Sequence, residues 1–346
     1  MATAFVDDDG GDGYEKGDHS TSGSLLMPLL PEFEDPMARP RYTGLATFMR
    51  APYREDPAGV DIGLIGVPFD GGVTNRTGTR HGPREIRNQS SLMRKINQAS
   101  GISPYELCRI ADLGDAWVQR PFHLESSLDE IAAFFARVRA AGVTPLSAGG
   151  DHSISLPILR ALGEDHPVGM VHFDAHCDTG SNYLGSNYHH GAPFSRAVEE
   201  GVLDPRRTVQ IGIRGGVNDR DVWQFSHESG MRVIYMHEFH EMGWKAAMAE
   251  ARRVVGDGPT YVSFDIDSLD PAYAPGTGTP EVGGFTTLQA QLMIRSLRGL
   301  NLVGADVVEV SPPFDPSGLT ALTGASMMFE LLCVLADAVA ARSPGR

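Results

Sequence analysis

Short apolar runs alternate with amphipathic segments along most of this chain, beginning near residue 60. The runs have the length of strands, and many are rich in β-branched residues, as buried strands are. The segments between them repeat their apolar residues at helical spacing. The alternation predicts a single-domain α/β fold whose mostly parallel, eight-stranded sheet is sandwiched by helices. The strand-like runs are residues 60–67, 108–113, 143–147, 168–173, 208–213, 232–235, 261–264 and 302–310, and the helix-like segments include residues 128–141, 245–255 and 288–297.

The first 40 residues differ in composition from the rest of the chain. They are rich in Asp, Gly, Ser and Pro, and such a segment buries too little apolar surface to fold alone. We therefore expect residues 1–40 to form a flexible acidic arm, whose apolar patch at residues 25–30 is a candidate for docking on a neighbouring subunit. Residues 41–346 show no internal repeat and no linker beyond about residue 60, so they are expected to form one domain.

Charge and cysteine content narrow the classes of partner. The formal net charge is -15, from 44 acidic and 29 basic residues, which argues against nucleic acid because binding to phosphates needs basic patches. The three cysteines are too few and too scattered for a disulfide framework, which favours a reducing, cytoplasmic setting. The chain opens with acids and not with a secretory signal, and no apolar stretch is expected to cross a bilayer.

Three of the predicted strands run directly into clusters of acids and histidines. In a parallel sheet the ligand crevice lies beyond the carboxyl ends of the strands, so the three clusters are expected to meet there. A single motif of this kind is usually a cap or a turn, and it is the convergence of three that predicts a functional site. The runs 143–147, 168–173 and 261–264 lead into Gly-Gly-Asp-His-Ser (149–153), Asp-Ala-His-Cys-Asp (174–178) and Asp-Ile-Asp (265–267).

The spacing within the clusters predicts a metal site. Residues two apart in an extended chain point to the same side, so alternate members of each cluster face one point. The four carboxylates among them would repel one another strongly and would not all stay ionised without cations. Their mixed oxygen and nitrogen donors suit two divalent ions that share a carboxylate, such as Mn²⁺, Ni²⁺ or Co²⁺, better than Ca²⁺ or Mg²⁺. The expected ligands are His152, Asp174, His176, Asp178, Asp265 and Asp267.

These motifs resemble the signatures of the ureohydrolase family, which includes arginases and agmatinases. The resemblance covers residues 41–338 and extends to Gly-Thr-Gly-Thr-Pro-Glu (276–281) and Asp-Val-Val-Glu-Val (306–310). It implies the arginase/deacetylase fold, with a catalytic domain over residues 41–346 and two metal ions, Mn²⁺ or Ni²⁺. It also implies a homotrimer or homohexamer, or a hetero-oligomer with a related subunit.

The resemblance further implies roles for individual residues. His152, Asp174, Asp178 and Asp265 would hold one metal ion, and Asp174, His176, Asp265 and Asp267 the other. A water activated between the metals would attack the guanidinium carbon, and Asp178 would accept its proton. His190 matches the proton-shuttling histidine of the family, and His189 beside it is expected to be a loop residue.

The remaining site residues are expected from the same resemblance. Glu281 is the candidate carboxylate for the guanidinium, while Glu309 is a candidate buried acid that supports the site. Asn182 and Tyr183, in the loop after the second motif, are expected to contact the substrate. Cys177 lies between two expected ligands and is interpreted as a core thiol.

The segments that flank the metal-site motifs indicate the substrate. Residues 41–44, 90–95 and 310–315 look most like guanidinopropionase and guanidinobutyrase, so 3-guanidinopropionate or 4-guanidinobutyrate is the first expectation. An acid substrate needs a cationic or amide partner, and Asn75, Arg80 and Arg87 are candidates that are equally open to a structural role. Agmatine is one alternative, and another is guanidine, dimethylguanidine or a biguanide such as metformin.

Two other classes of protein fit these motifs less well. A non-catalytic partner subunit would be expected to lose ligands, whereas this chain keeps all six expected ligands and His190. A deacetylase with one zinc ion would leave Asp178 and Asp267 without a purpose. The sequence therefore predicts a metal-dependent hydrolase that acts on linear amidines.

Overall fold

The computed structural model describes residues 33, 35–217 and 223–342, and the expected flexible arm lies outside them except for residues 33 and 35–40. Its centre is one sheet of eight strands in the order β2-β1-β3-β8-β7-β4-β5-β6. Every adjacent pair in this sheet is parallel, which confirms the predicted fold class. The strands are β1 Ile62–Val67, β2 Ile110–Asp115, β3 Thr144–Gly149, β4 Val168–Phe173, β5 Leu203–Ile213, β6 Arg232–Tyr235, β7 Thr260–Asp265 and β8 Leu302–Val308.

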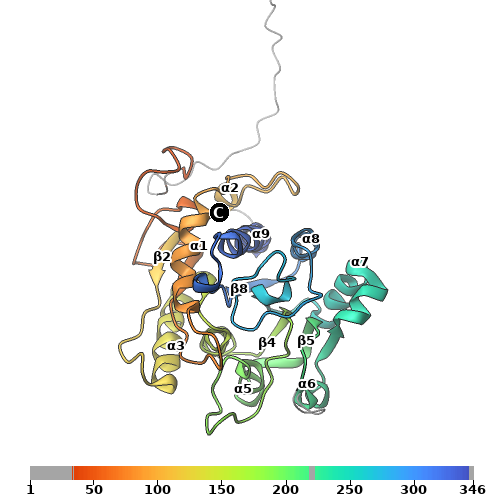
Figure 1. The fold of residues 1–346 in the computed structure, drawn as a ribbon. Helices are drawn as coiled ribbons and strands as arrows, with labels where there is room; N and C mark the ends of the chain where they lie inside the picture. Colours follow the sequence, from red (N-terminus) through yellow and green to blue (C-terminus); the bar gives the residue numbers. More distant parts are fainter. Residues whose placement is uncertain (1–32, 34, 218–222, 343–346) are drawn as a thin grey trace, which may run out of the picture.

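Helices cover both faces of the sheet (Figure 1). Helices α1, α7, α8 and α9 lie on one face, and α3, α5 and α6 lie on the other (Figure 1). The helices are α1 Gly82–Ser90, α2 Pro104–Leu107, α3 Leu124–Ala140, α4 Ser155–Leu162, α5 Pro193–Glu199, α6 Gln224–Ser229, α7 Met236–Val255, α8 Thr287–Ser296 and α9 Leu319–Arg342, and short 3₁₀ turns occur at Phe48–Arg50, Thr79–His81, His152–Ile154, Ile266–Ser268 and Pro312–Phe314.

Strand residues alternate between two hydrophobic cores, one on each side of the sheet. On β1, Ile62 and Leu64 pack in the core that includes α9, whereas Ile65 and Val67 pack in the core that includes α3 and α4. Because both faces are buried, these strands read as continuous apolar runs in the sequence instead of alternating ones. The layers leave the carboxyl ends of the strands free to carry polar loops.

Helix α9 corrects one expectation from the sequence. The Leu319–Arg342 helix is long and apolar enough to cross a membrane, although no such stretch was expected. In the fold, 83% of its most apolar window is buried, and it packs on β8, α1 and α8. A helix that is apolar on all sides is also what the core of a large domain requires. Its burial and the α/β fold are those of a soluble protein.

Candidate metal centre

The three polar clusters of the sequence meet at the carboxyl ends of neighbouring strands. Strands β3, β8, β7 and β4 are consecutive in the sheet, and the clusters follow β3, β4 and β7. Close packing behind the first cluster depends on Gly150, where a Cβ atom would lie 2.1 Å from the carbonyl oxygen of Phe69. Asp151 then accepts hydrogen bonds from the amides of Gly72 and Ser153, which orients the turn that carries His152.

The first group of potential ligands surrounds the Nδ1 atom of His152. This atom lies 2.9 Å from Asp178 Oδ2, 3.2 Å from Asp174 Oδ2 and 3.2 Å from Asp265 Oδ2. All four side chains are buried. Among the described residues, His152 Nδ1 has no hydrogen-bond partner of acceptable geometry. A ring nitrogen that faces three carboxylates without a bond to any of them is suited to a shared cation.

A second group lies beside the first and shares Asp174 with it. His176 Nδ1 lies 3.5 Å from Asp174 Oδ1 and 3.2 Å from Asp267 Oδ2. In each group the potential ligand atoms all lie within 4.8 Å of one another. Asp265 Oδ1 instead accepts the amide of Asp267 at 2.7 Å. Asp174 is thus placed to serve two ions, whereas a bridging role for Asp265 stays a prediction.

The electrostatics of the cluster favour bound cations. Burial, together with the charges of Asp267 and Asp174, raises the pKa of Asp265 well above its usual value. Burial and Asp174 also raise the pKa of Asp267. Burial opposes ionisation of Asp174 as well, but neighbouring histidines, first among them His172, bring its pKa well below the usual value. Without metal, the cluster therefore keeps protons on acids and histidines that divalent ions would replace.

Residues that are not among the expected ligands hold the first group in place. His152 Nε2 lies 2.8 Å from Ser263 Oγ, and this hydroxyl donates to Asp306 Oδ1 at 2.8 Å. The other oxygen of Asp306 accepts hydroxyl hydrogen bonds from Ser155 and Tyr261, each at 2.6 Å. This chain fixes which nitrogen of His152 faces the cluster. No local pattern in the sequence reveals this hydrogen-bonded chain, because its partners lie more than 40 residues apart.

His172 supports Asp174 in a similar way. Its Nε2 atom lies 2.7 Å from Asp174 Oδ2, and its Nδ1 atom lies 3.1 Å from the Gln210 side-chain nitrogen. His172 is fully buried and contacts the ring of Phe194, with ring centroids 4.5 Å apart. The same side chain also lies close enough to Asp174 and His152 to belong to a potential ligand group.

His190 lies in a buried position between a hydroxyl and a carboxylate. Its Nε2 atom is 2.8 Å from Thr74 Oγ1, and its Nδ1 atom is 2.9 Å from Glu309 Oε1. Burial opposes protonation, but the Glu309 carboxylate prevails and raises the pKa of His190 to about 9. His189 instead contacts the carbonyl oxygen of Ser181 at 2.9 Å and is partly exposed, as expected of a loop residue.

The two candidate acids for the guanidinium occupy different surroundings. Glu281 is partly exposed, and its Oε1 atom lies 3.7 Å from His176 Nε2. Glu309 is buried and has a positive φ of 64° just after β8. Its Oε1 atom accepts the amide of His152 at 2.9 Å, whereas its Oε2 atom has no partner among the described residues. An unpaired buried carboxylate oxygen beside His190 is suited to receive a cationic donor.

The expected substrate loop is organised largely by its own contacts. The Asn182 side chain bonds to Asn187 and to the amide of Gly185, so it shapes the loop. Tyr183 is 49% exposed, and its ring is tilted against the ring of His189, with the ring centroids 5.7 Å apart. Contact of Asn182 and Tyr183 with a substrate stays a prediction.

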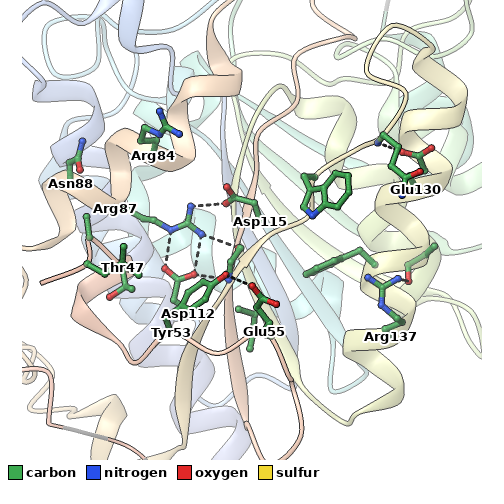
Figure 2. Close-up of a pocket in the computed structure, with 18 of the residues that line it drawn as sticks. Thr47, Tyr53, Glu55, Arg84, Arg87, Asn88, Asp112, Asp115, Glu130 and Arg137 are labelled. Atoms are coloured by element: carbon green, nitrogen blue, oxygen red, sulfur yellow. Dashed lines mark hydrogen bonds and ion pairs between the residues drawn. The ribbon is translucent and has the colours of Figure 1, made fainter.

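Two of the three residues that were candidates to bind a substrate carboxylate form ion pairs with acids of the protein. Arg80 is paired with the buried Asp70. Arg87 bonds to Asp112 at 2.9 Å and to Asp115 at 2.6 Å, at the edge of a cavity of about 1110 Å³ beside β2 (Figure 2). This cavity shares no lining residue with the metal-ligand groups, so it is not the candidate catalytic site despite its size. Asn75 is exposed in the loop after β1.

Cys177 lies between the two ligand groups in sequence but is fully buried away from solvent. Burial raises the pKa of its thiol well above the usual value. The side chain packs with Ile213 and Val233, which supports its interpretation as a core thiol.

The model of the Arginase family matches residues 60–333, which include every expected metal ligand. The chain belongs to the arginase family. Hydrolases of the arginase family cleave a guanidino C–N bond and use pairs of divalent metal ions, and the two ligand groups fit such a pair. The protein is therefore an arginase-family hydrolase that acts on a guanidino compound.

Individual members of the arginase family agree with this result. The chain is 64% identical to guanidinopropionase of Pseudomonas aeruginosa over 311 residues, which cover 90% of this chain and 98% of the relative. It is 46% identical to guanidinobutyrase of the same organism over 304 residues, which cover 87% of this chain and 95% of that one. The solved structure of proclavaminate amidino hydrolase from Streptomyces clavuligerus shares the fold with a TM-score of 0.83 at 39% identity, over 87% of this chain and 100% of that one.

Proposed function

We propose that this protein hydrolyses a short guanidino acid to urea and the corresponding amino acid, with 3-guanidinopropionate as its best substrate. The observation that carries the proposal is the 64% identity to a guanidinopropionase over 90% of this chain. The identity to a guanidinobutyrase is lower, at 46%, which ranks 4-guanidinobutyrate second. The reaction adds the oxygen of one water to the guanidinium carbon and breaks the bond from that carbon to the substituted nitrogen. Both hydrogens of the water end on this nitrogen, so the products are urea and an ammonium group.

The proposed metal ligands are the six residues expected from the sequence. One ion would be held around His152 Nδ1 and the other around His176 Nδ1, with Asp174 contributing an oxygen to each. Mn²⁺ is the first choice because carboxylate oxygens outnumber nitrogens in both groups, and Ni²⁺ is the second. When bound, the pair of ions supplies the Lewis acidity that lowers the pKa of water and offsets negative charge in the transition state.

Two side chains are proposed to handle protons. Asp178 is buried against His152 Nδ1 at 2.9 Å, where it can accept the proton of the attacking water. His190 is proposed to carry a proton toward the departing amine. Its hydrogen bond to Glu309 favours the protonated ring, and Thr74 orients the opposite nitrogen.

The guanidinium is proposed to bind through Glu281 or Glu309. Glu281 follows from the family resemblance and lies beside His176. Glu309 has the stronger physical support, because its buried Oε2 atom has no donor among the described residues and a bound guanidinium would supply one. Glu281→Gln and Glu309→Gln, compared for their effect on KM and kcat, would separate the two assignments.

Assembly and location are part of the proposal. We infer that the protein acts in the cytoplasm as a homotrimer or homohexamer, with a hetero-oligomer as the alternative. The buried thiols of Cys108, Cys177 and Cys333 are compatible with a reducing compartment. Sedimentation of the full-length chain, alone and after co-expression with any related subunit, measures the assembly directly.

A panel of guanidino compounds tests the substrate. Protein loaded separately with Mn²⁺ and Ni²⁺ is assayed for urea with 3-guanidinopropionate, 4-guanidinobutyrate, agmatine, arginine, guanidine, dimethylguanidine and metformin. The proposal expects the largest kcat/KM for 3-guanidinopropionate. A larger kcat/KM for agmatine, or for a guanidine without a carboxylate, would refute the substrate assignment while leaving the reaction type intact.

A further inference from the structure

The carboxylate of a guanidino acid would meet negative charge beside the metal centre. Two divalent ions would offset the four carboxylates of the ligand groups, but Glu281 and Glu309 add two more carboxylates next to them. A carboxylate substrate therefore needs a cation at the mouth of the site, both to offset this repulsion and to orient the chain. The candidates Arg80 and Arg87 are already paired with carboxylates of their own.

We propose that the guanidinium of Arg76 binds the carboxylate of the substrate, an inference that rests on the proposed guanidino-acid hydrolysis. Arg76 lies in the loop between β1 and the turn Thr79–His81, and its side chain is exposed. Within the described part of the chain, no Asp or Glu pairs with it. Its Cζ atom lies 5.0 Å from the centroid of the Phe314 ring, a contact that orients the guanidinium without neutralising its charge.

The loop that carries Arg76 is anchored to the catalytic residues. Gly72 donates to Asp151 at 2.7 Å and accepts the amide of His190 at 2.8 Å. Thr74, two residues before Arg76, lies 2.8 Å from His190 Nε2. At its far end the loop is held by the bond from the Gly78 amide to Asp70 at 2.8 Å. The segment that contains Arg76 therefore begins and ends at fixed points beside the site.

Gly278 brings Arg76 next to the acid proposed to bind the guanidinium. A Cβ atom on Gly278 would lie 3.3 Å from the carbonyl oxygen of Arg76 and 3.5 Å from Glu309 Oε2. The backbone of Arg76 and the unpaired oxygen of Glu309 are thus separated only by the space that this glycine leaves open. A substrate whose guanidinium binds Glu309 would therefore have its carboxylate close to the loop that carries the exposed Arg76 side chain.

Other described cations near the cluster are unavailable for this role. Arg214 is partly buried and donates to the backbone carbonyls of Gly212, Asp267, Ser268, Leu269, Glu281 and Val282. His189 contacts the Ser181 carbonyl. A planar guanidinium such as that of Arg76 also matches a carboxylate with two parallel hydrogen bonds, which an ammonium does not.

The test compares charged and uncharged substrates with Arg76→Gln. The kcat/KM for 3-guanidinopropionate should fall roughly 10- to 100-fold, mainly through KM, because a charge-assisted pair of hydrogen bonds is lost. The kcat/KM for propylguanidine, which has no carboxylate, should change by less than about threefold. Arg76→Lys should recover part of the loss, and Arg76→Glu should shift the preference toward agmatine.

Arg137→Gln is the matched control. Arg137 is also exposed and lies over an aromatic ring, with its Cζ atom 5.3 Å from the centroid of Phe134, but it lines the cavity beside β2. It should leave kcat/KM for both substrates unchanged. Metal content per chain, measured by mass spectrometry, should be equal in all variants.

The possible outcomes are distinct. If the wild-type protein releases no urea from any guanidino acid, the proposed function fails. If the wild type hydrolyses guanidino acids but Arg76→Gln lowers kcat/KM equally for 3-guanidinopropionate and propylguanidine, or lowers neither, the role of Arg76 is overturned.

Discussion

Replacing Ser263 with alanine perturbs the metal centre without touching a proposed ligand. The Ser263 hydroxyl lies between His152 Nε2 and Asp306 Oδ1, at 2.8 Å from each, and all three side chains are fully buried. Ser263→Ala removes this hydroxyl and leaves both neighbours without that partner. Asp306 keeps its hydrogen bonds from Ser155 and Tyr261 on the other oxygen.

The magnitude follows from the number of groups left unpaired. A buried donor or acceptor that loses its partner costs about 1–3 kcal/mol, so the two together should lower the free energy of unfolding by about 2–6 kcal/mol. A second consequence concerns the metal, because the hydroxyl holds the ring of His152 in the orientation that presents Nδ1 to the cluster. Loss of such a supporting contact lowers metal affinity by about 10- to 100-fold.

Urea unfolding of the metal-free protein and competition of the loaded protein against a chelator measure the two effects separately. Ser147→Ala is the matched control. Ser147 is also fully buried, on β3, which β8 separates from β7 in the sheet, but its hydroxyl has no hydrogen-bond partner among the described residues. Its removal should leave stability unchanged or raise it by up to about 1 kcal/mol. Equal metal affinity in Ser263→Ala and the wild type would refute the supporting role of this hydroxyl.

Three further predictions concern protonation, packing and the thiols. In the metal-free protein Glu309 raises the pKa of His190 to about 9, so Glu309→Gln should return this pKa toward 6.5. NMR titration of the imidazole would measure the change, and His190→Asn would identify the signal that belongs to His190. Because that pKa lies above its unfolded value, His190 stabilises the fold below about pH 6.5 and loses this contribution as the pH rises to about 9; a stability profile without this loss in the wild type would contradict the assignment. Gly150→Ala places a Cβ atom 2.1 Å from the Phe69 carbonyl and should cost about 3 kcal/mol in unfolding free energy, whereas Gly216→Ala, with no atom within 4 Å, should cost far less. The buried thiols of Cys108, Cys177 and Cys333 should not react with a thiol reagent until the protein unfolds, and rapid labelling of the native protein would contradict their burial.

The sequence predicted the sheet well because strands buried on both faces leave continuous apolar runs. All eight predicted runs coincide with strands, but β5 begins at Leu203 and not at residue 208. After the buried Leu203, residues 204–207 are partly or fully exposed, so they carry no apolar signal. Helix α7 begins at Met236 and not at residue 245, and a kink at Gly243 interrupts the helical spacing on which the prediction relied.

The ligand groups were predictable for a different reason. Most of the expected ligands are two residues apart in the sequence at the ends of β4 and β7. Supporting residues lacked any such local signal. Ser263 and Asp306 act on His152 through the pairing of β7 with β8, which no spacing reveals. The same holds for the candidate cations, since the ion pairs of Arg80 and Arg87 and the unpaired state of Arg76 depend on the folded chain.

The most direct test of the account is a parallel measurement of metal and urea. Wild-type protein and Asp174→Asn are loaded with Mn²⁺, and bound metal per chain is determined together with the urea released from 3-guanidinopropionate. Because Asp174 is the carboxylate shared by both ligand groups, the account predicts two ions per chain and steady urea release for the wild type, and loss of both for Asp174→Asn. Retention of two ions and of urea release by Asp174→Asn would contradict the proposed two-metal centre.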